Sequence, residues 1–236
     1  MSKSPKKSEN RLLAALPQDE YERLVANMES VFLKFKQSVY EPNEPIEYVY
    51  FIKNGVTSLL NVMEDGREVE VATVGNEGMV GLPVFLGSDK IPGRGFSQIP
   101  GDAWRMKADV FKDKVIPGTR LHDLLQRYTQ ALFNLIAQGS ACNSLHSVEE
   151  RMCRWLLMTQ DRVGEDEFPL TQEFLGQMLG VRRPTVSLAA SILQKAGLIC
   201  YSRGKITILE REGLEASTCE CYAIVKAEFD RLVGGN

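Results

Sequence analysis

The chain contains 236 residues, of which 44% are hydrophobic and 25% are charged, and its formal net charge is -3. This length is sufficient for two domains with buried cores, and the composition is that of an ordinary globular protein. No apolar run is long enough for a secretory signal or a membrane span, so we expect a cytoplasmic protein without membrane contacts. Five cysteines, all in the second half of the chain, are an odd number and do not predict a disulfide framework.

The N-terminal half changes from helical to strand-like periodicity. Residues 1–10 are polar and rich in lysine and serine, and we expect them to be disordered. Over residues 17–35 apolar side chains recur at helical spacing, which predicts a short helix. Between residues 36 and 106 the period is two and turn residues recur, which predicts a compact antiparallel β-roll. The strand candidates are residues 48–52, 56–62, 68–74 and 103–106.

A β-roll also suits a cupin-type enzyme, in which several histidines hold a catalytic metal. The two histidines of the chain, His122 and His146, both lie beyond the predicted roll. A multi-histidine metal centre therefore cannot form inside the roll, and we predict no catalytic residues. Cys219 and Cys221 alternate along a predicted helix, so they should point to different faces, and we predict no metal site.

Residues 120–145 form the longest predicted helix, after a short helix at residues 107–114. Apolar and small residues at intervals of three and four define one stripe along the long helix. The stripe contains Leu125, Tyr128, Leu132, Leu135, Gly139 and Cys142. A seam of about three heptads is typical of a parallel coiled coil, so we predict a homodimer with these residues at its interface. The alternative is that the same stripe packs on the roll.

After a helix expected at residues 149–158, residues 171–197 have the pattern of two helices joined by a sharp turn. Thr171 suits the N-cap of the first helix, and Gly180 can adopt the positive φ that the turn requires. Pro184 is tolerated only in the first turn of a helix, so it marks the start of the second helix near Arg182.

A hairpin of residues 198–201 and 205–209 follows, and then an amphipathic helix at residues 211–233. Between Thr171 and Glu210 five basic residues outnumber two acidic ones. A locally basic module with a helix for the major groove predicts binding to double-stranded DNA; the alternative is a winged helix that contacts protein. The expected DNA-contacting residues are Thr171, Arg182, Arg183, Thr185, Ser187, Leu188, Arg203 and Lys205.

The pattern TQEFLGQMLGVRRPTVS followed by LQKAGLICYSRGKITI resembles the DNA-binding end of the Crp/Fnr superfamily of bacterial transcription regulators. The resemblance covers about residues 17–210. It implies an α+β protein with a β-roll effector domain (residues 17–118), a dimerisation helix (119–147) and a winged helix-turn-helix domain. We assign residues 148–233 to this last domain, because the helix expected at residues 211–233, which lies beyond the resemblance, should pack on it. It also implies a homodimer that binds a pseudo-palindromic operator, and it leaves RNA polymerase open as a further partner.

The recognition helix departs from the pattern of the better-known members at two positions. Arg183 matches their first arginine, whereas Pro184 stands in place of a glutamate and Leu188 in place of a second arginine. The resemblance therefore implies sequence-specific DNA binding but not the operator sequence that those members bind.

Residues 75–82 resemble the phosphate-binding cassette of Crp/Fnr sensors. Gly81 matches the cassette glycine, Leu82 replaces the glutamate that holds the ribose, and Arg94 is the candidate for the phosphate-binding arginine. Ile136 stands where relatives place hydroxyl side chains toward the base. We expect these four residues to line a small-molecule effector site with little affinity for cyclic AMP. The alternatives are a cyclic-nucleotide-responsive regulator, or a ligand-binding roll without specific DNA recognition.

The resemblance also raises the question of cofactors that other Crp/Fnr sensors use. Iron–sulfur sensing uses cysteines near the N-terminus, whereas the first cysteine here is Cys142. His122 is the one candidate for an axial haem ligand near the roll, and a surface or capping role suits it better. We therefore expect no cofactor.

Overall fold

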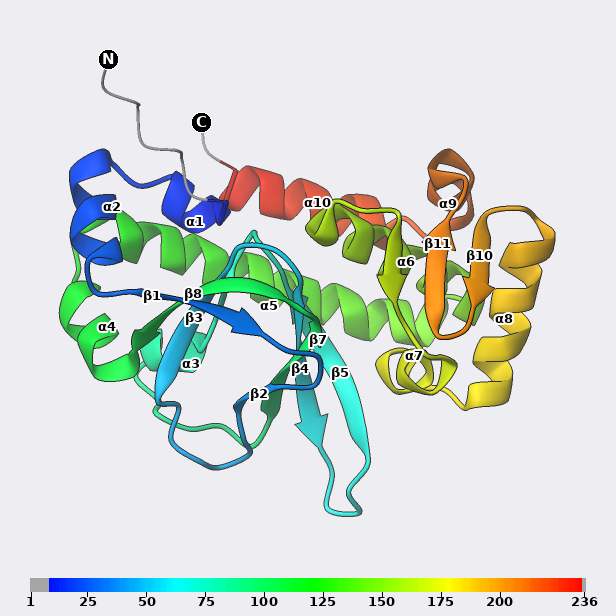
Figure 1. Ribbon diagram of the computed structural model, residues 1–236, viewed down its shortest axis with the longest axis horizontal. Coiled ribbons are helices and arrows are strands. Elements are labelled where there is room, and N and C mark those ends of the chain that lie inside the picture. The colour runs from blue at the N-terminus through cyan, green and yellow to red at the C-terminus, as the bar shows by residue number, and fades with distance from the viewer. Residues whose placement is uncertain (1–8, 235–236) are drawn as a thin grey trace.

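The computed structural model describes residues 9–234 of the chain. A β-roll occupies one end of the molecule, a winged helical domain occupies the other, and the long helix α5 (Arg120–Leu145) runs beside both (Figure 1). Most of the tail that we expected to be disordered, residues 1–10, lies outside the described residues. Asn10 is ordered and buried, because it caps α1 (Arg11–Ala14) and its amide donates to the carbonyls of Ile52 and Gly78 at 2.8 Å each.

The roll consists of two four-stranded sheets with the strand orders β1-β8-β3-β6 and β2-β7-β4-β5. The first sheet contains β1 (Glu29–Leu33), β3 (Tyr48–Ile52), β6 (Met79–Val80) and β8 (Gly101–Lys107). The second contains β2 (Ser38–Tyr40), β4 (Val56–Val62), β5 (Glu68–Val74) and β7 (Arg94–Ile99). All ladders are antiparallel, so the predicted roll and its four strand candidates are confirmed.

The helix expected over residues 17–35 is correct only in its first part. Helix α2 (Gln18–Val25) ends early, and residues 29–33 form β1, with Glu29 opposite Arg105 of β8. Apolar spacing could not separate the two states here. The strand forms because β8 offers an edge whose backbone donors and acceptors need a partner.

Helix α3 (Leu82–Phe85) lies within the roll, between β6 and β7, whereas α4 (Ala108–Lys114) and α5 lead from the roll to the rest of the chain. The stripe along α5 that we predicted as a dimer seam is buried inside the chain: Leu125 and Cys142 are 0% exposed, and Leu132 is 7% exposed. The Tyr128 hydroxyl donates to the Met79 carbonyl at 3.0 Å, and Leu135 belongs to the same core. The prediction that the five buried residues of this stripe contact a second subunit is therefore wrong. Because the roll and the C-terminal helix cover this face, the alternative that the stripe packs within the chain is correct. Gly139 is not enclosed in this way, because a Cβ atom at its position would have no atom within 4 Å.

The winged domain is built on α6 (Val148–Val163), which is longer than expected and starts with a capping box between Ser147 and Glu150. It continues with β9 (Glu167–Pro169), α7 (Gln172–Leu179), α8 (Arg183–Lys195), β10 (Ile199–Ser202) and β11 (Lys205–Ile208). Strands β10, β11 and β9 form one antiparallel sheet in that order. The expected helix pair and hairpin are confirmed.

The single helix expected over residues 211–233 is broken in two, α9 (Arg211–Ser217) and α10 (Cys221–Leu232). The break falls at Thr218, whose backbone is extended. Helix α10 then lies along α5 (Figure 1), where Phe229 packs against Tyr128 with ring centroids 6.4 Å apart.

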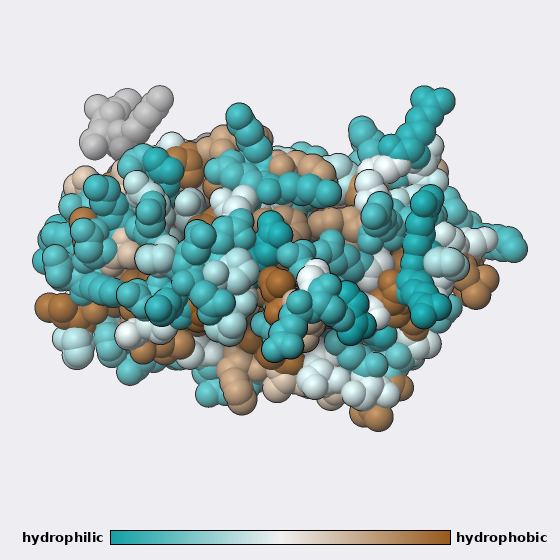
Figure 2. Space-filling model, turned by 90° about the horizontal axis from the view of Figure 1, so that it is seen from below, coloured by the Kyte–Doolittle hydropathy of each residue, from teal (hydrophilic) through white to brown (hydrophobic). Residues whose placement is uncertain are grey.

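In the described range, no helix is both long and apolar enough to cross a membrane. On the underside of the molecule, apolar residues are scattered among hydrophilic ones (Figure 2).

Candidate nucleic-acid interface and effector cavity

The turn between α7 and α8 is fixed by local interactions. The Thr171 hydroxyl accepts a hydrogen bond from the Phe174 N–H at 3.1 Å and so caps α7. Gly180 has φ 64°, which a residue with a side chain rarely adopts. At Gly176 a Cβ would lie 2.9 Å from the Val181 carbonyl oxygen, so the close approach of the turn to α7 requires glycine there.

Helix α8 divides into a buried and an exposed face. Its buried face consists of Val186, Ala189, Ala190 and Leu193. On the exposed face lie Arg182, Arg183, Thr185 and Leu188, and Leu188 is 62% exposed. Ser187 is half-buried, and its hydroxyl lies 2.7 Å from the Gln172 side-chain oxygen, so it joins α8 to α7. The structure therefore presents the first turns of α8 to solvent and uses Ser187 within the domain.

The wing lies beside this helix. Arg203 (φ 51°) and Gly204 (φ 76°) are both left-handed, as a tight two-residue hairpin turn requires. Arg203 is exposed at the tip of the hairpin. The Lys205 ammonium lies 2.6 Å from a Glu167 carboxylate oxygen, and this contact raises the pKa of Lys205 and lowers that of Glu167. Part of the positive charge of the wing is thus already neutralised by β9.

A cavity of about 230 Å³ opens inside the roll against α5. Three of the four predicted effector residues, Gly81, Leu82 and Ile136, line this cavity together. Arg94 does not line it. Its guanidinium contacts Glu68 at 2.9 Å and lies 3.8 Å from Glu41, so the fold does not place Arg94 in the cavity lining as we expected. Opposite charges nearby are a better partner for this cation than an apolar cavity.

The cavity wall is mainly aliphatic. Its other residues are Tyr40, Leu59, Leu60, Asn61, Val71, Met79, Pro83, Leu86, Ile91, Gly93 and Leu132. Tyr40 and Asn61 are the polar side chains of this lining, and burial raises the pKa of the Tyr40 hydroxyl. Such a wall favours an apolar ligand with at most a few hydrogen-bonding groups.

Sequence reasoning missed the contacts that join the roll to the winged domain. Phe174 of α7 packs edge-on against Phe96 of β7, with centroids 5.8 Å apart, and the Gln177 amide donates to Glu68 at 2.7 Å. The Arg162 guanidinium of α6 forms an ion pair at 2.9 Å with Glu77, and both side chains are 7% exposed. Buried pairing of this kind leaves no periodic signal in the sequence, because each partner is a single charged residue.

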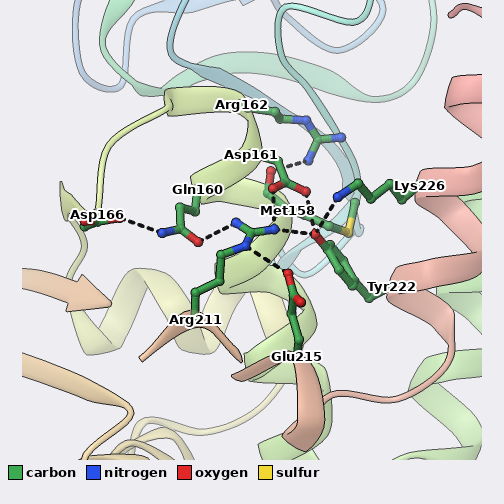
Figure 3. A network of polar contacts seen from close by, with 9 residues as sticks. All are labelled: Met158, Gln160, Asp161, Arg162, Asp166, Arg211, Glu215, Tyr222 and Lys226. Atoms are coloured by element: carbon green, nitrogen blue, oxygen red, sulfur yellow. Dashed lines mark hydrogen bonds and ion pairs between the residues drawn. The ribbon is translucent and has the colours of Figure 1, made fainter. Parts of the chain in front are cut away.

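A polar network fixes the C-terminal helices to α6 (Figure 3). The Arg211 guanidinium donates to Gln160 at 2.6 Å, to Asp161 at 2.8 Å and to the Tyr222 oxygen at 2.7 Å. The Tyr222 hydroxyl donates in turn to Asp161 at 2.8 Å. This network holds α9 and the start of α10 against the winged domain.

Comparisons with known proteins agree with this architecture. The chain matches the family model of the cyclic nucleotide-binding domain over residues 31–116 and that of the Crp-like helix-turn-helix domain over residues 150–217. The protein therefore belongs to the Crp/Fnr family. It is a transcription regulator with a cyclic nucleotide-binding-type domain followed by a DNA-binding helix-turn-helix domain.

Solved structures of the same fold include FixK2 from Bradyrhizobium japonicum, with a TM-score of 0.69 and 19% identity over 81% of this chain and 98% of that chain. A transcriptional regulator of the Crp family from Thermus thermophilus has a TM-score of 0.67 and 16% identity over 79% of this chain and 95% of that chain. The c-di-GMP-responsive global regulator CLP from Xanthomonas campestris has a TM-score of 0.66 and 15% identity over 81% and 99%. Among curated protein sequences, none matches the chain significantly.

Proposed function

We propose that the protein acts as a homodimer that binds a pseudo-palindromic operator through α8 and responds to an apolar small molecule in the roll. The observation that carries this proposal is the exposed start of α8. Arg183 projects from its first helical position, next to the exposed Thr185 and close to the basic wing. An arginine at this place can make a bidentate contact with a guanine edge in the major groove.

The exposed Leu188 stands where better-known family members have a second arginine. The recognition surface of α8 therefore combines one arginine with one apolar side chain. An apolar side chain in the major groove can contact the methyl group of thymine, but it cannot accept or donate a hydrogen bond. We therefore propose an operator half-site with one guanine opposite Arg183 and a thymine near Leu188. Arg203 at the wing tip is suited to a phosphate contact, which adds affinity without sequence preference.

The outward face of α5 supports the homodimer. It carries Phe133 and Ile136, which are 66% and 39% exposed, and Gln126, Gln130, Ala137 and Ser140 are exposed along the same face. The spacing along this face alternates between four and three residues, as in a coiled-coil seam, at positions 126, 130, 133, 137 and 140. Pairing of two α5 helices on this face buries Phe133 and places two recognition helices about one DNA turn apart, roughly 34 Å.

The cavity supports an effector other than a cyclic nucleotide. Leu82 occupies the place of a ribose-binding carboxylate, and Arg94 is paired with Glu68 outside the cavity. Each buried ligand group that lacks its hydrogen bond costs about 1–3 kcal/mol, so cyclic AMP should bind in the millimolar range or more weakly. Ile136 lines the cavity and is also partly exposed on the α5 face, so a ligand in the cavity can act on the dimer contact.

Selection of binding sites from random DNA, followed by titration at several salt concentrations, tests the proposal. A specific regulator should prefer one pseudo-palindrome over bulk DNA by about three or more orders of magnitude. Equal affinity for all duplexes contradicts it and favours a ligand-binding module with incidental DNA contacts. Calorimetry with cyclic AMP and cyclic GMP tests the effector separately. Micromolar binding that is lost in Arg94→Ala would restore the cyclic-nucleotide alternative.

A further inference from the structure

Four side chains that can bind a metal converge where α5 meets the C-terminal helices. They are Cys142 and His146 at the end of α5, Cys219 just before α10, and Cys221 at the first position of α10. Their ligand atoms, three Sγ atoms and one imidazole nitrogen, all lie within 4.8 Å of one another. The three cysteines are at most 4% exposed and form no disulfide, and the His146 side chain is 16% exposed.

Local backbone structure explains why four residues so far apart in sequence meet. Cys142 lies in the last turn of α5, and His146 is the C-cap residue whose N–H donates to the Cys142 carbonyl at 3.1 Å, so the end of the helix keeps the two residues close together. Cys219 lies in the non-helical segment between α9 and α10, whereas Cys221 is the first residue of α10. The expectation that Cys219 and Cys221 point to different faces of one helix is therefore wrong. The break at Thr218 allows both thiols to face α5.

Two distances within this cluster are close to those of a tetrahedral zinc site. The Sγ atoms of Cys142 and Cys219 are 3.5 Å apart, and Cys221 Sγ lies 3.6 Å from His146 Nδ1. With Zn–S bonds of about 2.3 Å and Zn–N bonds of about 2.0–2.1 Å, a regular tetrahedron separates two sulfurs by about 3.8 Å. It separates a sulfur from a nitrogen by about 3.6 Å. The two measured pairs thus differ from these values by at most a few tenths of an ångström, and all the other pairs lie within 4.8 Å, so a zinc ion requires shifts of at most about 1 Å.

The residues around the cluster also suit a metal. His146 Nε2 lies 3.2 Å from a Glu220 carboxylate oxygen, which holds the ring so that Nδ1 faces the thiols. A carboxylate behind a histidine is the usual outer support of a zinc ligand. The Gln138 amide donates to Cys221 Sγ at 3.1 Å. Arg154 interacts electrostatically with Cys142, and Arg151 interacts with both Cys142 and Cys219, so positive charge lies near two of the three sulfurs.

We propose that Cys142, His146, Cys219 and Cys221 bind one Zn²⁺ ion per chain. Three thiolates and one neutral imidazole fill all four positions of a tetrahedral ion, which is the arrangement of a structural zinc site rather than a catalytic one. The ion would join the end of α5, immediately before α6, to the segment between α9 and α10. Together with the network around Tyr222, which is adjacent to Cys221, it would hold α10 across the junction of the two domains (Figure 3).

Elemental analysis of the full chain, purified under reducing conditions, tests the proposal. We expect about one zinc per chain, and we expect Cys142→Ser, Cys219→Ser and His146→Ala each to lose most of it. Cys200→Ser and Cys153→Ser are matched controls, because Cys200 is exposed in β10 and Cys153 is buried in α6, both outside the cluster. These two variants should keep the metal.

Two further measurements guard against loss of metal through misfolding. His146→Cys provides a fourth sulfur ligand, so it should retain zinc where His146→Ala does not. Apoprotein reconstituted with Co²⁺ should show the visible absorption of a tetrahedral cobalt thiolate, and Cys142→Ser should weaken that absorption. Zinc retained at the unmodified level in Cys142→Ser would overturn the proposal. Iron with labile sulfide in place of zinc, or a metal-free chain with a Cys142–Cys219 disulfide, would also overturn it.

Discussion

The indole Nε1 of Trp155 donates a hydrogen bond of 3.0 Å to the carboxylate of Glu70. Glu70 lies on β5 of the roll and Trp155 on α6 of the winged domain, so this bond crosses the boundary between effector and DNA-binding domains. The second carboxylate oxygen accepts a hydrogen bond from the Ser58 hydroxyl at 2.8 Å. Desolvation raises the pKa of Glu70 from 4.5 to about 7, although hydrogen bonds from Ser58 and Trp155 oppose the shift.

This pKa makes the stability of the protein depend on pH. The folded chain holds the Glu70 proton between pH 4.5 and about 7, whereas the unfolded chain releases it near 4.5. The free energy of unfolding contributed by this group should therefore fall by about 3 kcal/mol as the pH rises through that window. Glu70→Gln should remove this slope while it keeps a hydrogen-bond acceptor for Trp155. Urea unfolding of both proteins at pH 5 and pH 8 measures how much the free energy of unfolding changes with pH. An equal change in the unmodified protein and in Glu70→Gln would contradict the raised pKa of Glu70.

Arg183→Ala should weaken binding to the selected operator by about 1–3 kcal/mol and relax the preference at one position per half-site. The reason is the loss of two parallel hydrogen bonds to one base, which lysine cannot replace. Arg203→Ala is the comparison, because a wing phosphate contact should lower the salt dependence without changing the preferred sequence. Competition binding against operators altered at single positions distinguishes the two. Equal losses on every sequence would make Arg183 a phosphate contact as well.

Phe133→Asp should convert the protein to a monomer at micromolar concentration, because it places two carboxylates in an apolar contact between α5 helices. Leu209→Asp is a suitable control, since Leu209 is 59% exposed and lies outside α5. Sedimentation of both variants gives the result directly. A Phe133→Asp dimer as stable as the control would place the subunit contact on another surface. Leu132→Asp is a less informative variant, because Leu132 is buried within the chain and its replacement should unfold the protein.

Arg162→Met should destabilise the chain by about 3–5 kcal/mol, because it leaves the buried Glu77 carboxylate without its cation. The double variant Arg162→Met, Glu77→Gln should recover much of this loss, since it removes the unpaired charge. Thermal unfolding of both single variants and the double variant completes the cycle. Additive losses in the double variant would mean that the two residues act independently.

The sequence alone determined the elements whose causes are local. Thr171, Gly180 and Pro184 occupy positions where only a few residue types fit, and the structure places the N-cap, the turn and the first helical turn there. The boundaries of α5 and of the strands β3, β4 and β5 were likewise predicted, because their apolar periods are long and regular. Local preferences act within a few residues, so they can be read without knowledge of the fold.

Only the tertiary structure decided which partners those elements meet. The apolar stripe of α5 indicated a buried face, but the same stripe suits a second subunit or the chain's own roll, and long-range packing selected the roll. Arg94 had the charge for a phosphate, yet the fold places it beside the carboxylates of Glu68 and Glu41 and not in the cavity wall. Cys142 and Cys219 are separated by 77 positions, and a break in one helix brings their sulfurs to 3.5 Å. Periodicity states that a residue is buried, whereas its neighbours follow from contacts between distant segments that no local pattern contains.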